Sequence, residues 1–180
     1  MHALNRLLLS ALIVVGGCVK AARLEPAEIK QFAPFAELGG VRLGMSGVDL
    51  RQLRTQARPL PYTGLTETGP DGYEVFFYIS NSIDTTMRAS DRLTSVAAVR
   101  HFSGRTEAES EWARQLGNLR RAEAGKELPI DSSMDALGTS SRKVRFVATG
   151  RTISVVMSRS RPDTSATSIA VRFRRSDDKP

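Results

Sequence analysis

The chain has one cysteine, two histidines and only 6% aromatic residues. A single cysteine cannot form a disulfide within its own chain, so a disulfide-built scaffold is excluded. No P-loop, dinucleotide-binding glycine fingerprint or zinc-ligand spacing is present in the sequence. We therefore expect no cofactor, no metal site and no enzymatic activity.

The remaining composition is that of an ordinary folded domain. Among 180 residues, 41% are apolar and 25% are charged, and charges of both signs are mixed. This balance argues against whole-chain disorder, and the length favours one domain with a real hydrophobic core. With 26 basic against 19 acidic residues, the chain has a formal charge of +7.

The first 17 residues have the layout of a secretory signal peptide. Arg6 supplies a positive charge, residues 7–15 are apolar except for Ser10, and two glycines follow. A helix over the 11 residues 7–17 would be about 16 Å long, roughly half of the hydrocarbon core, so it cannot span a bilayer. We therefore predict that residues 1–17 direct export.

The lone cysteine follows this segment directly. The run Val15-Gly16-Gly17-Cys18 resembles the lipobox of bacterial lipoproteins, in which the cysteine is lipidated and becomes the first residue. This resemblance implies acylation of Cys18, and Val19 at the next position implies sorting to the outer membrane, facing the periplasm. The alternative is cleavage after Ala21 and release as a soluble periplasmic protein.

Export limits what the basic charge can mean. Cleavage before Cys18 removes only Arg6 among the charged side chains, which leaves 25 basic and 19 acidic groups, a net charge of +6. Outside the cytoplasm, the polyanions within reach are lipid headgroups, cell-wall polymers and acidic proteins. We therefore expect an envelope protein or an anionic polymer as partner, and no nucleic acid.

The mature chain divides into a tether at residues 18–38, one domain at residues 39–175 and a frayed tail at residues 176–180. The first helix of the domain is predicted after Ser46, because Ser46 and Asp49 form a capping box ahead of apolar residues at helical spacing. Basic residues up to Arg58 lie toward its end, and Pro59 stops it.

A second helix is predicted where Thr106 and Glu109 form another capping box, and Gly125 ends it. Its apolar stripe consists of Ala108, Trp112, Leu116 and Leu119. Its first turn contains Glu107, Glu109 and Glu111, which we interpret as complementing the helix dipole.

Alternating apolar and polar residues predict strands at residues 73–80, 93–102, 143–148, 153–157 and 169–174, with a polar loop at residues 129–141. The last three strands form an antiparallel meander with one solvated face. The predicted fold class is α+β, a two-layer domain with an antiparallel sheet packed against the two helices. His101, within the second strand, has no evident catalytic partner, and we interpret it as structural or surface-exposed.

One predicted sheet face combines cations with aromatic rings. Its members are Glu74, Phe76, Tyr78, Lys143, Arg145, Arg172 and Arg174. Such a mixture suits an anionic or peptide partner, through charge-assisted hydrogen bonds and ring stacking. The alternative is an ordinary solvated face, on which long side chains cover apolar neighbours.

The start of the first helix resembles small outer-membrane lipoproteins of the BamE/SmpA type, and also related two-layer domains such as the β-lactamase-inhibitor-like ones. The matching residues are Leu43, Gly44, Met45, Ser46, Val48 and Leu53. No Gly-x-Pro follows the helix, and the second long helix is a further departure from that pattern. The resemblance implies a noncatalytic envelope module with an interaction or assembly role, and it transfers no binding residue.

Overall fold

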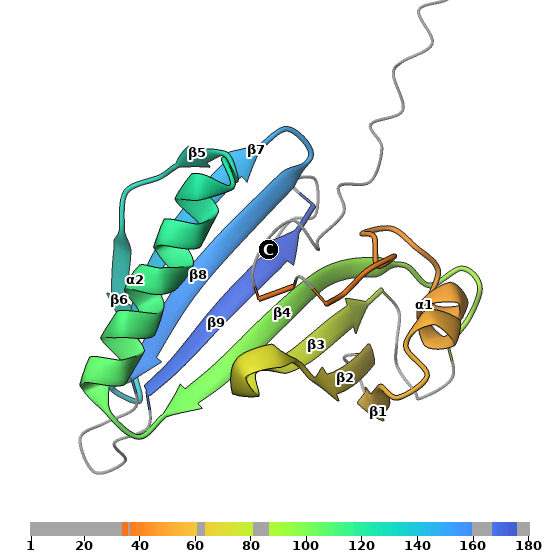
Figure 1. The fold of residues 1–180 in the computed structure, drawn as a ribbon, viewed down its shortest axis with the longest axis horizontal. Helices are drawn as coiled ribbons and strands as arrows, with labels where there is room; N and C mark the ends of the chain where they lie inside the picture. The colour runs from red at the N-terminus through yellow and green to blue at the C-terminus, as the bar shows by residue number, and fades with distance from the viewer. Residues whose placement is uncertain (1–33, 36, 61–63, 81–86, 160–166, 176–180) are drawn as a thin grey trace, which may run out of the picture.

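The computed structural model describes residues 34–35, 37–60, 64–80, 87–159 and 167–175 (Figure 1). The predicted signal peptide, the lipidation site Cys18, the alternative cleavage site at Ala21 and the tail at residues 176–180 lie outside the described residues. Within the described ranges, no helix is both long and apolar enough to cross a bilayer.

The described chain forms an antiparallel sheet with two α-helices, which agrees with the predicted α+β class. The sheet order is β1-β2-β3-β4-β9-β8-β7-β5, and β6 also pairs with β7. The strands are β1 (Arg58–Leu60), β2 (Gly64–Thr68), β3 (Glu74–Ile79), β4 (Leu93–Phe102), β5 (Lys126–Glu127), β6 (Asp131–Met134), β7 (Ser140–Ala148), β8 (Arg151–Arg159) and β9 (Thr167–Arg174). A short 3-10 helix, η2 (Pro70–Gly72), connects β2 to β3.

The alternation of apolar residues located the long strands correctly. The predicted strands correspond to β3, β4, β7, β8 and β9, and the meander β7-β8-β9 is antiparallel as expected. In β3, Val75, Phe77 and Ile79 are buried, while the residues between them are exposed or half-buried. The strand β9 then pairs with β4, so that the two halves of the chain share one sheet.

The prediction of a polar loop at residues 129–141 was wrong, because this segment contains β6 and the start of β7. All four residues of β6 are exposed. The strand is held by backbone pairing along β7, from Asp131 opposite Lys143 to Met134 opposite Ser140. A strand with no buried side chain gives no period-two signal in the sequence.

The helix α1 (Gly47–Leu53) begins as predicted. The Ser46 hydroxyl accepts a hydrogen bond from the Asp49 backbone N–H at 3.0 Å and donates to the Asp49 carboxylate at 2.7 Å. The helix ends earlier than predicted, because Arg54 leaves the helical conformation and its Nε donates to Glu67 on β2 at 3.0 Å. Arg58, predicted near the helix end, is the first residue of β1.

The helix α2 (Arg105–Arg121) buries the predicted apolar stripe, but its predicted cap was wrong. Gly104 is the N-cap in an extended conformation, with no side-chain cap bond. The chain enters the helix directly after β4, so that Thr106 already lies in the first turn. There its carbonyl accepts from the Ser110 hydroxyl at 2.9 Å.

The end of α2 also differs from the prediction that Gly125 terminates it. Glu123 adopts a left-handed conformation, with φ 49°. The Glu123 N–H donates to the Arg120 carbonyl at 3.2 Å, and the Ala124 N–H donates to the Leu119 carbonyl at 3.0 Å. These two bonds form a Schellman motif, in which a non-glycine residue takes the position that glycine usually fills.

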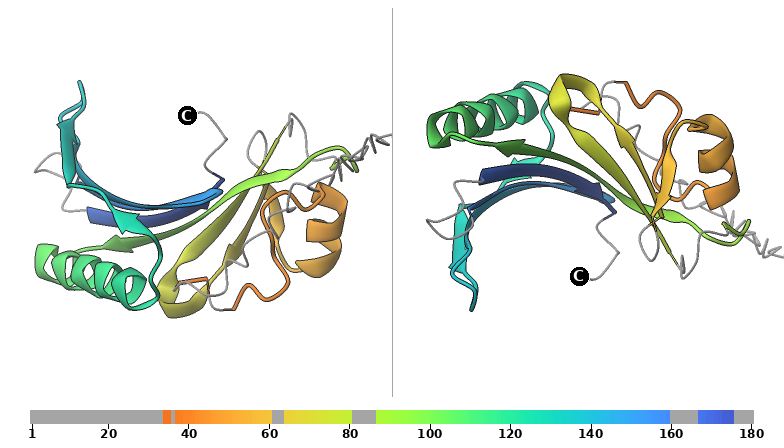
Figure 2. Two further views of the ribbon diagram at one scale, coloured as in Figure 1. Left: turned by 90° about the horizontal axis from the view of Figure 1, so that it is seen from above. Right: turned by 90° about the horizontal axis from the view of Figure 1, so that it is seen from below.

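The two helices do not cover the sheet equally. The helix α2 lies over β4, β8 and β9, whereas α1 lies at the opposite end of the sheet, beside the short β1 (Figures 1 and 2). Leu50 of α1 is fully buried in the same hydrophobic core as the stripe of α2. The prediction was a simple sheet layer covered by two helices. The observed sheet is larger than that arrangement implies.

The packed domain begins earlier than the predicted boundary at residue 39. Phe35 and Leu38, which the sequence had assigned to the tether, are 0% and 2% exposed in the core. Burial of these two apolar side chains in the core is favoured because it removes their apolar surface from water. Within the predicted tether, residues 18–33 and residue 36 lie outside the described residues.

Candidate functional site

The candidate site lies on the sheet face opposite α2. Residues paired across antiparallel strands project from the same face, so the strand register defines which side chains lie together. The strands β7, β8 and β9 bend along their length, and the face turned away from α2 is concave in both views of Figure 2. On this face, residues of five strands line a hollow of about 300 Å³, which we call the basic hollow.

The lining of the basic hollow has a rim of long polar side chains and a floor of short ones. Its rim consists of Tyr78, Lys143, Arg145, Arg172 and Arg174, and its floor consists of Ala97, Val99, Thr152, Ser154, Val156 and Ala170. The lining includes four cations and no carboxylate. None of these cations belongs to an ion pair between described residues.

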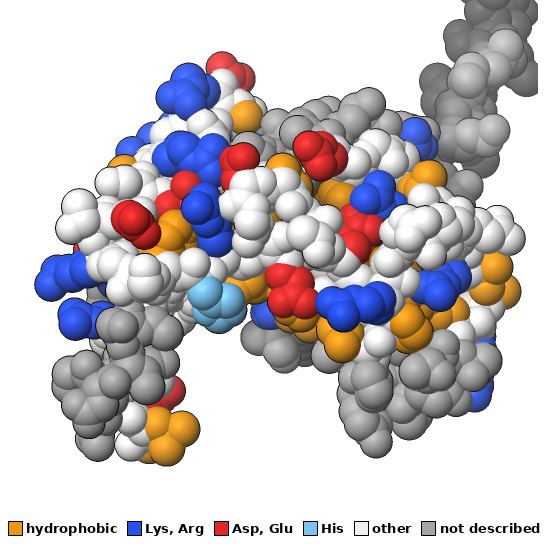
Figure 3. Space-filling view, turned by 60° about the horizontal axis from the view of Figure 1, so that its bottom comes forward, with side chains coloured by type: hydrophobic (Ala, Val, Ile, Leu, Met, Phe, Trp, Pro, Cys, Tyr) orange, Lys and Arg blue, Asp and Glu red, His pale blue; other side chains and the backbone are white. Residues whose placement is uncertain are grey.

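The side chains of the hollow differ in charge from those on the face drawn in Figure 3, which does not include the hollow. In Figure 3, acidic and basic side chains are interspersed. On α2, for example, Arg120 forms a bidentate pair with Glu127 at 2.7 and 2.8 Å. The cations of the hollow form no such ion pair with another described residue, so the hollow carries an excess of positive charge.

The cations are close enough to influence each other electrostatically. The pKa of Lys143 is lowered, first by partial burial and then by the positive charges of Arg145 and Arg174. Asp131 on the neighbouring strand acts in the opposite direction without overcoming these effects. Bringing an anion into the hollow would remove this repulsion and add charge-assisted hydrogen bonds.

Tyr78 forms the aromatic wall of the hollow. The guanidinium of Arg172 lies 5.0 Å from the centre of the Tyr78 ring, and its Nη2 donates to the Tyr78 hydroxyl at 3.4 Å. The contact crosses β4 and holds Arg172 extended over the sheet, because Tyr78 is on β3 and Arg172 is on β9. An extended guanidinium keeps donors available to a ligand.

The structure brings together five of the seven residues of the predicted binding face. Phe76 and Glu74 lie on the same face but do not line the hollow. Phe76 is half-buried, and Glu74 accepts a hydrogen bond from the Thr66 hydroxyl at 3.2 Å. The floor residues were missed, although the alternation in β4, β8 and β9 placed them on this face.

His101 is exposed on the surface (Figure 3) and is not part of the hollow. It lies on β4 opposite Ser168 of β9. Among the residues that the structure describes, no three His, Cys, Asp or Glu side chains are grouped as a metal site would need.

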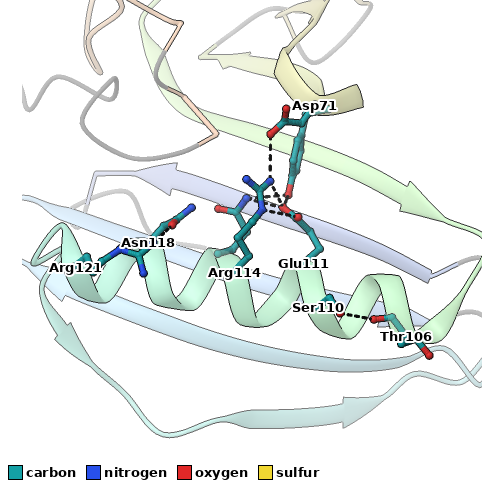
Figure 4. A network of polar contacts seen from close by, with 9 residues as sticks. Asp71, Thr106, Ser110, Glu111, Arg114, Asn118 and Arg121 are labelled. Atoms are coloured by element: carbon teal, nitrogen blue, oxygen red, sulfur yellow. Dashed lines mark hydrogen bonds and ion pairs between the residues drawn. The ribbon is translucent and has the colours of Figure 1, made fainter.

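A second polar cluster links α2 to η2 and is shown in Figure 4. The Glu111 carboxylate accepts two bonds from Arg114 at 2.8 Å and a bond from the Gln115 amide at 2.7 Å. The Tyr73 hydroxyl also donates to Glu111, and Arg114 reaches Asp71 at 3.3 Å. The sequence predicts only that Glu111 complements the helix dipole, whereas in the structure its side chain is 7% exposed and belongs to this cluster.

The protonation states in this cluster are fixed by its contacts. Burial acts to raise the pKa of Glu111, but hydrogen bonds from Arg114, Tyr73 and Gln115 outweigh it and the pKa is lowered. Burial and the Glu111 carboxylate raise the pKa of Tyr73. At neutral pH the cluster therefore contains a carboxylate, a guanidinium and a neutral phenol, held between two elements of the fold.

Fold and site together define an α+β protein with a cationic, concave sheet face. Comparison with protein-family models, curated proteins and solved structures found no match.

Proposed function

We propose that the protein is a noncatalytic envelope lipoprotein that acts as an interaction module and binds an anionic partner in the basic hollow. The observation that supports this most directly is the group of four cations in one hollow without a lining carboxylate. Repulsion between like charges disfavours such a group in the free protein. A binding site often has features that are costly to stability but useful to a ligand.

The noncatalytic part of the proposal is supported by the placement of two titratable groups. The Glu111 carboxylate is occupied by four hydrogen bonds, and His101 stands apart on the surface. A general base needs a free lone pair within reach of a substrate proton. The Glu111 carboxylate does not meet this requirement, and His101 does not line the hollow.

The lipoprotein part of the proposal depends on Cys18 and has its own test. We expect the wild-type protein to stay in the membrane fraction after a carbonate wash, because each buried acyl methylene adds about 0.8 kcal/mol of membrane affinity. Cys18→Ser cannot be acylated and is expected in the soluble fraction. Equal partitioning of the two proteins would contradict the anchor and favour the soluble periplasmic binding module.

The binding part is tested by reversing charges in the hollow. Arg145→Glu/Arg174→Glu is expected to weaken binding to immobilised polyglutamate at least about tenfold, because it turns two attractive contacts into repulsive ones. The matched control is Arg105→Glu/Arg121→Glu, which makes the same charge change on exposed positions of α2.

Binding is measured at one ionic strength, and circular dichroism checks that both variants fold. Retention of affinity in the hollow variant, or an equal loss in the control, would refute the hollow as the binding surface. A loss confined to the hollow variant would support it.

A further inference from the structure

The basic hollow is ordered into rows that cross the strands. Two neighbouring rows are central to its shape. The cationic row consists of Ala97, Arg172, Ser154 and Arg145, and the apolar row consists of Val99, Ala170 and Val156, ending at Lys143. Along each strand the rows are two residues apart, which is about 6.7 Å.

The apolar row is a short hydrophobic strip that lies beside the cationic row. Val99, Ala170 and Val156 are only half-buried, so part of each side chain faces the hollow. They lie on three adjacent strands, about 4.8 Å apart. A ligand that carries charge alone, such as an inorganic anion or a polyglutamate coil, would leave this strip in contact with water.

On the side away from the cations, the apolar row is bordered mainly by uncharged polar side chains. There the next row consists of His101, Ser168, Ser158 and Ser141. A ligand lying along the apolar row would therefore meet cations on one side and mainly hydroxyl groups on the other. Such an environment matches a ligand that is apolar on one stripe and acidic on one flank.

The shape of the face favours a rod laid across the strands. Because β7, β8 and β9 bend along their length, the trough of the concave face runs across them (Figure 2). An α-helix presents the same face once per turn, about every 5.4 Å, close to the spacing between strands. Side chains at i, i+4 and i+7 of one helix can thus contact the three residues of the apolar row.

We infer that the basic hollow receives an acidic amphipathic helix of a partner protein, with its apolar stripe on Val99, Ala170 and Val156 and its carboxylates toward Arg145, Arg172 and Arg174. This inference rests on the proposed function and specifies the kind of partner. The short floor side chains let the helix approach the sheet, and the cations pair with one flank only.

The probe is a synthetic peptide of about 18 residues, long enough to form a helix, with a leucine stripe flanked on one side by glutamates. A peptide of the same composition, scrambled so that no apolar stripe forms, is the control ligand. Polyglutamate is the second control ligand. Titration calorimetry measures each affinity, and circular dichroism of the peptide reports helix formation on binding.

The discriminating variant is Val99→Thr/Val156→Thr, which keeps side-chain shape and β-propensity while adding hydroxyls to the apolar row. It is expected to weaken peptide binding about tenfold and to leave polyglutamate binding unchanged, because only the peptide buries the row. Val147→Thr, on β7 outside the hollow, is the matched control.

The outcomes separate this inference from the proposed function. Tighter binding of the amphipathic peptide than of its scramble, lost in the double variant, supports the helix site. Equal affinity of both peptides, or no effect of the double variant, overturns the helix site. Anion binding in the hollow still stands in that case if Arg145→Glu/Arg174→Glu weakens polyglutamate binding about tenfold. Absence of binding to every probe overturns both.

Discussion

Glu111→Gln is expected to lower the free energy of unfolding at pH 7 by about 2 kcal/mol, because hydrogen bonds to a charged group are worth more than those to a neutral one. The carboxylate is the common acceptor for Tyr73, Arg114 and Gln115. A glutamine amide has one acceptor oxygen, and its NH₂ group would face existing donors. The contact between α2 and η2 would weaken as a result.

The same variant is expected to change the pH dependence of stability. The pKa of Glu111 is lowered in the folded state from its ordinary value near 4.5, so the folded protein binds fewer protons than the unfolded chain. The stability that it contributes is complete above the unfolded value and is lost as pH falls through the lowered folded pKa. The variant cannot lose this contribution and should respond less to acid.

Urea unfolding at pH 7 and at pH 4 measures both effects. Glu107→Gln makes the same change on an exposed position of the same helix, and we expect it to cost no more than about 0.5 kcal/mol. An equal loss in the two variants at pH 7, or an unchanged pH dependence in Glu111→Gln, would contradict the role given to this cluster.

The cluster around Glu111 illustrates what the sequence does not reveal. Tyr73 and Glu111 are 38 positions apart, and their contact depends on how α2 settles beside η2. In the sequence, Glu111 is one of three glutamates near a helix start, and nothing distinguishes it from its neighbours. Only its spacing sets it apart, because Glu111 is three residues after Ala108 and four before Gln115 and so lies on the buried side of α2.

The fold was predictable where side-chain burial is periodic. The long strands and the apolar stripe of α2 follow from spacing alone, because one face of each is buried. The short edge strands β1, β5 and β6 are fixed by backbone pairing and are largely exposed, so no pattern marks them. The cap of α2 was missed because Gly104, two residues after the end of β4, begins the helix without a side-chain bond.

The candidate site was predictable in part for the same reason. Alternation placed Tyr78, Lys143 and Arg172 on one face, but it did not say which strands are neighbours. The pairing of β4 with β9 brings Tyr78 within reach of Arg172 and inserts a floor of small residues between the cations. That long-range pairing determines the depth of the hollow, and it depends on the whole topology rather than on any segment.

The second large effect is expected from a backbone position at the Tyr78 side of the hollow. Gly64 has φ +123° and pairs with Tyr78 at the start of β2. A Cβ at this position would lie 2.2 Å from the Phe77 carbonyl oxygen and 3.1 Å from the Ile79 side chain. Side-chain-bearing residues rarely adopt this conformation, and the carbonyl belongs to a paired strand that cannot easily move.

Gly64→Ala is therefore expected to lower the free energy of unfolding by about 3 kcal/mol, as the sum of backbone strain and steric overlap. Gly39→Ala is the control, because a Cβ there meets nothing within 4 Å and φ is not positive. The control should remain within about 0.5 kcal/mol of wild type in urea unfolding. Comparable stability of the two variants would contradict a requirement for glycine at position 64, where β2 pairs with Tyr78 of β3. If Gly64→Ala folds at low temperature, its polyglutamate affinity should fall as well, because a displaced β2–β3 pair moves the aromatic wall away from Arg172.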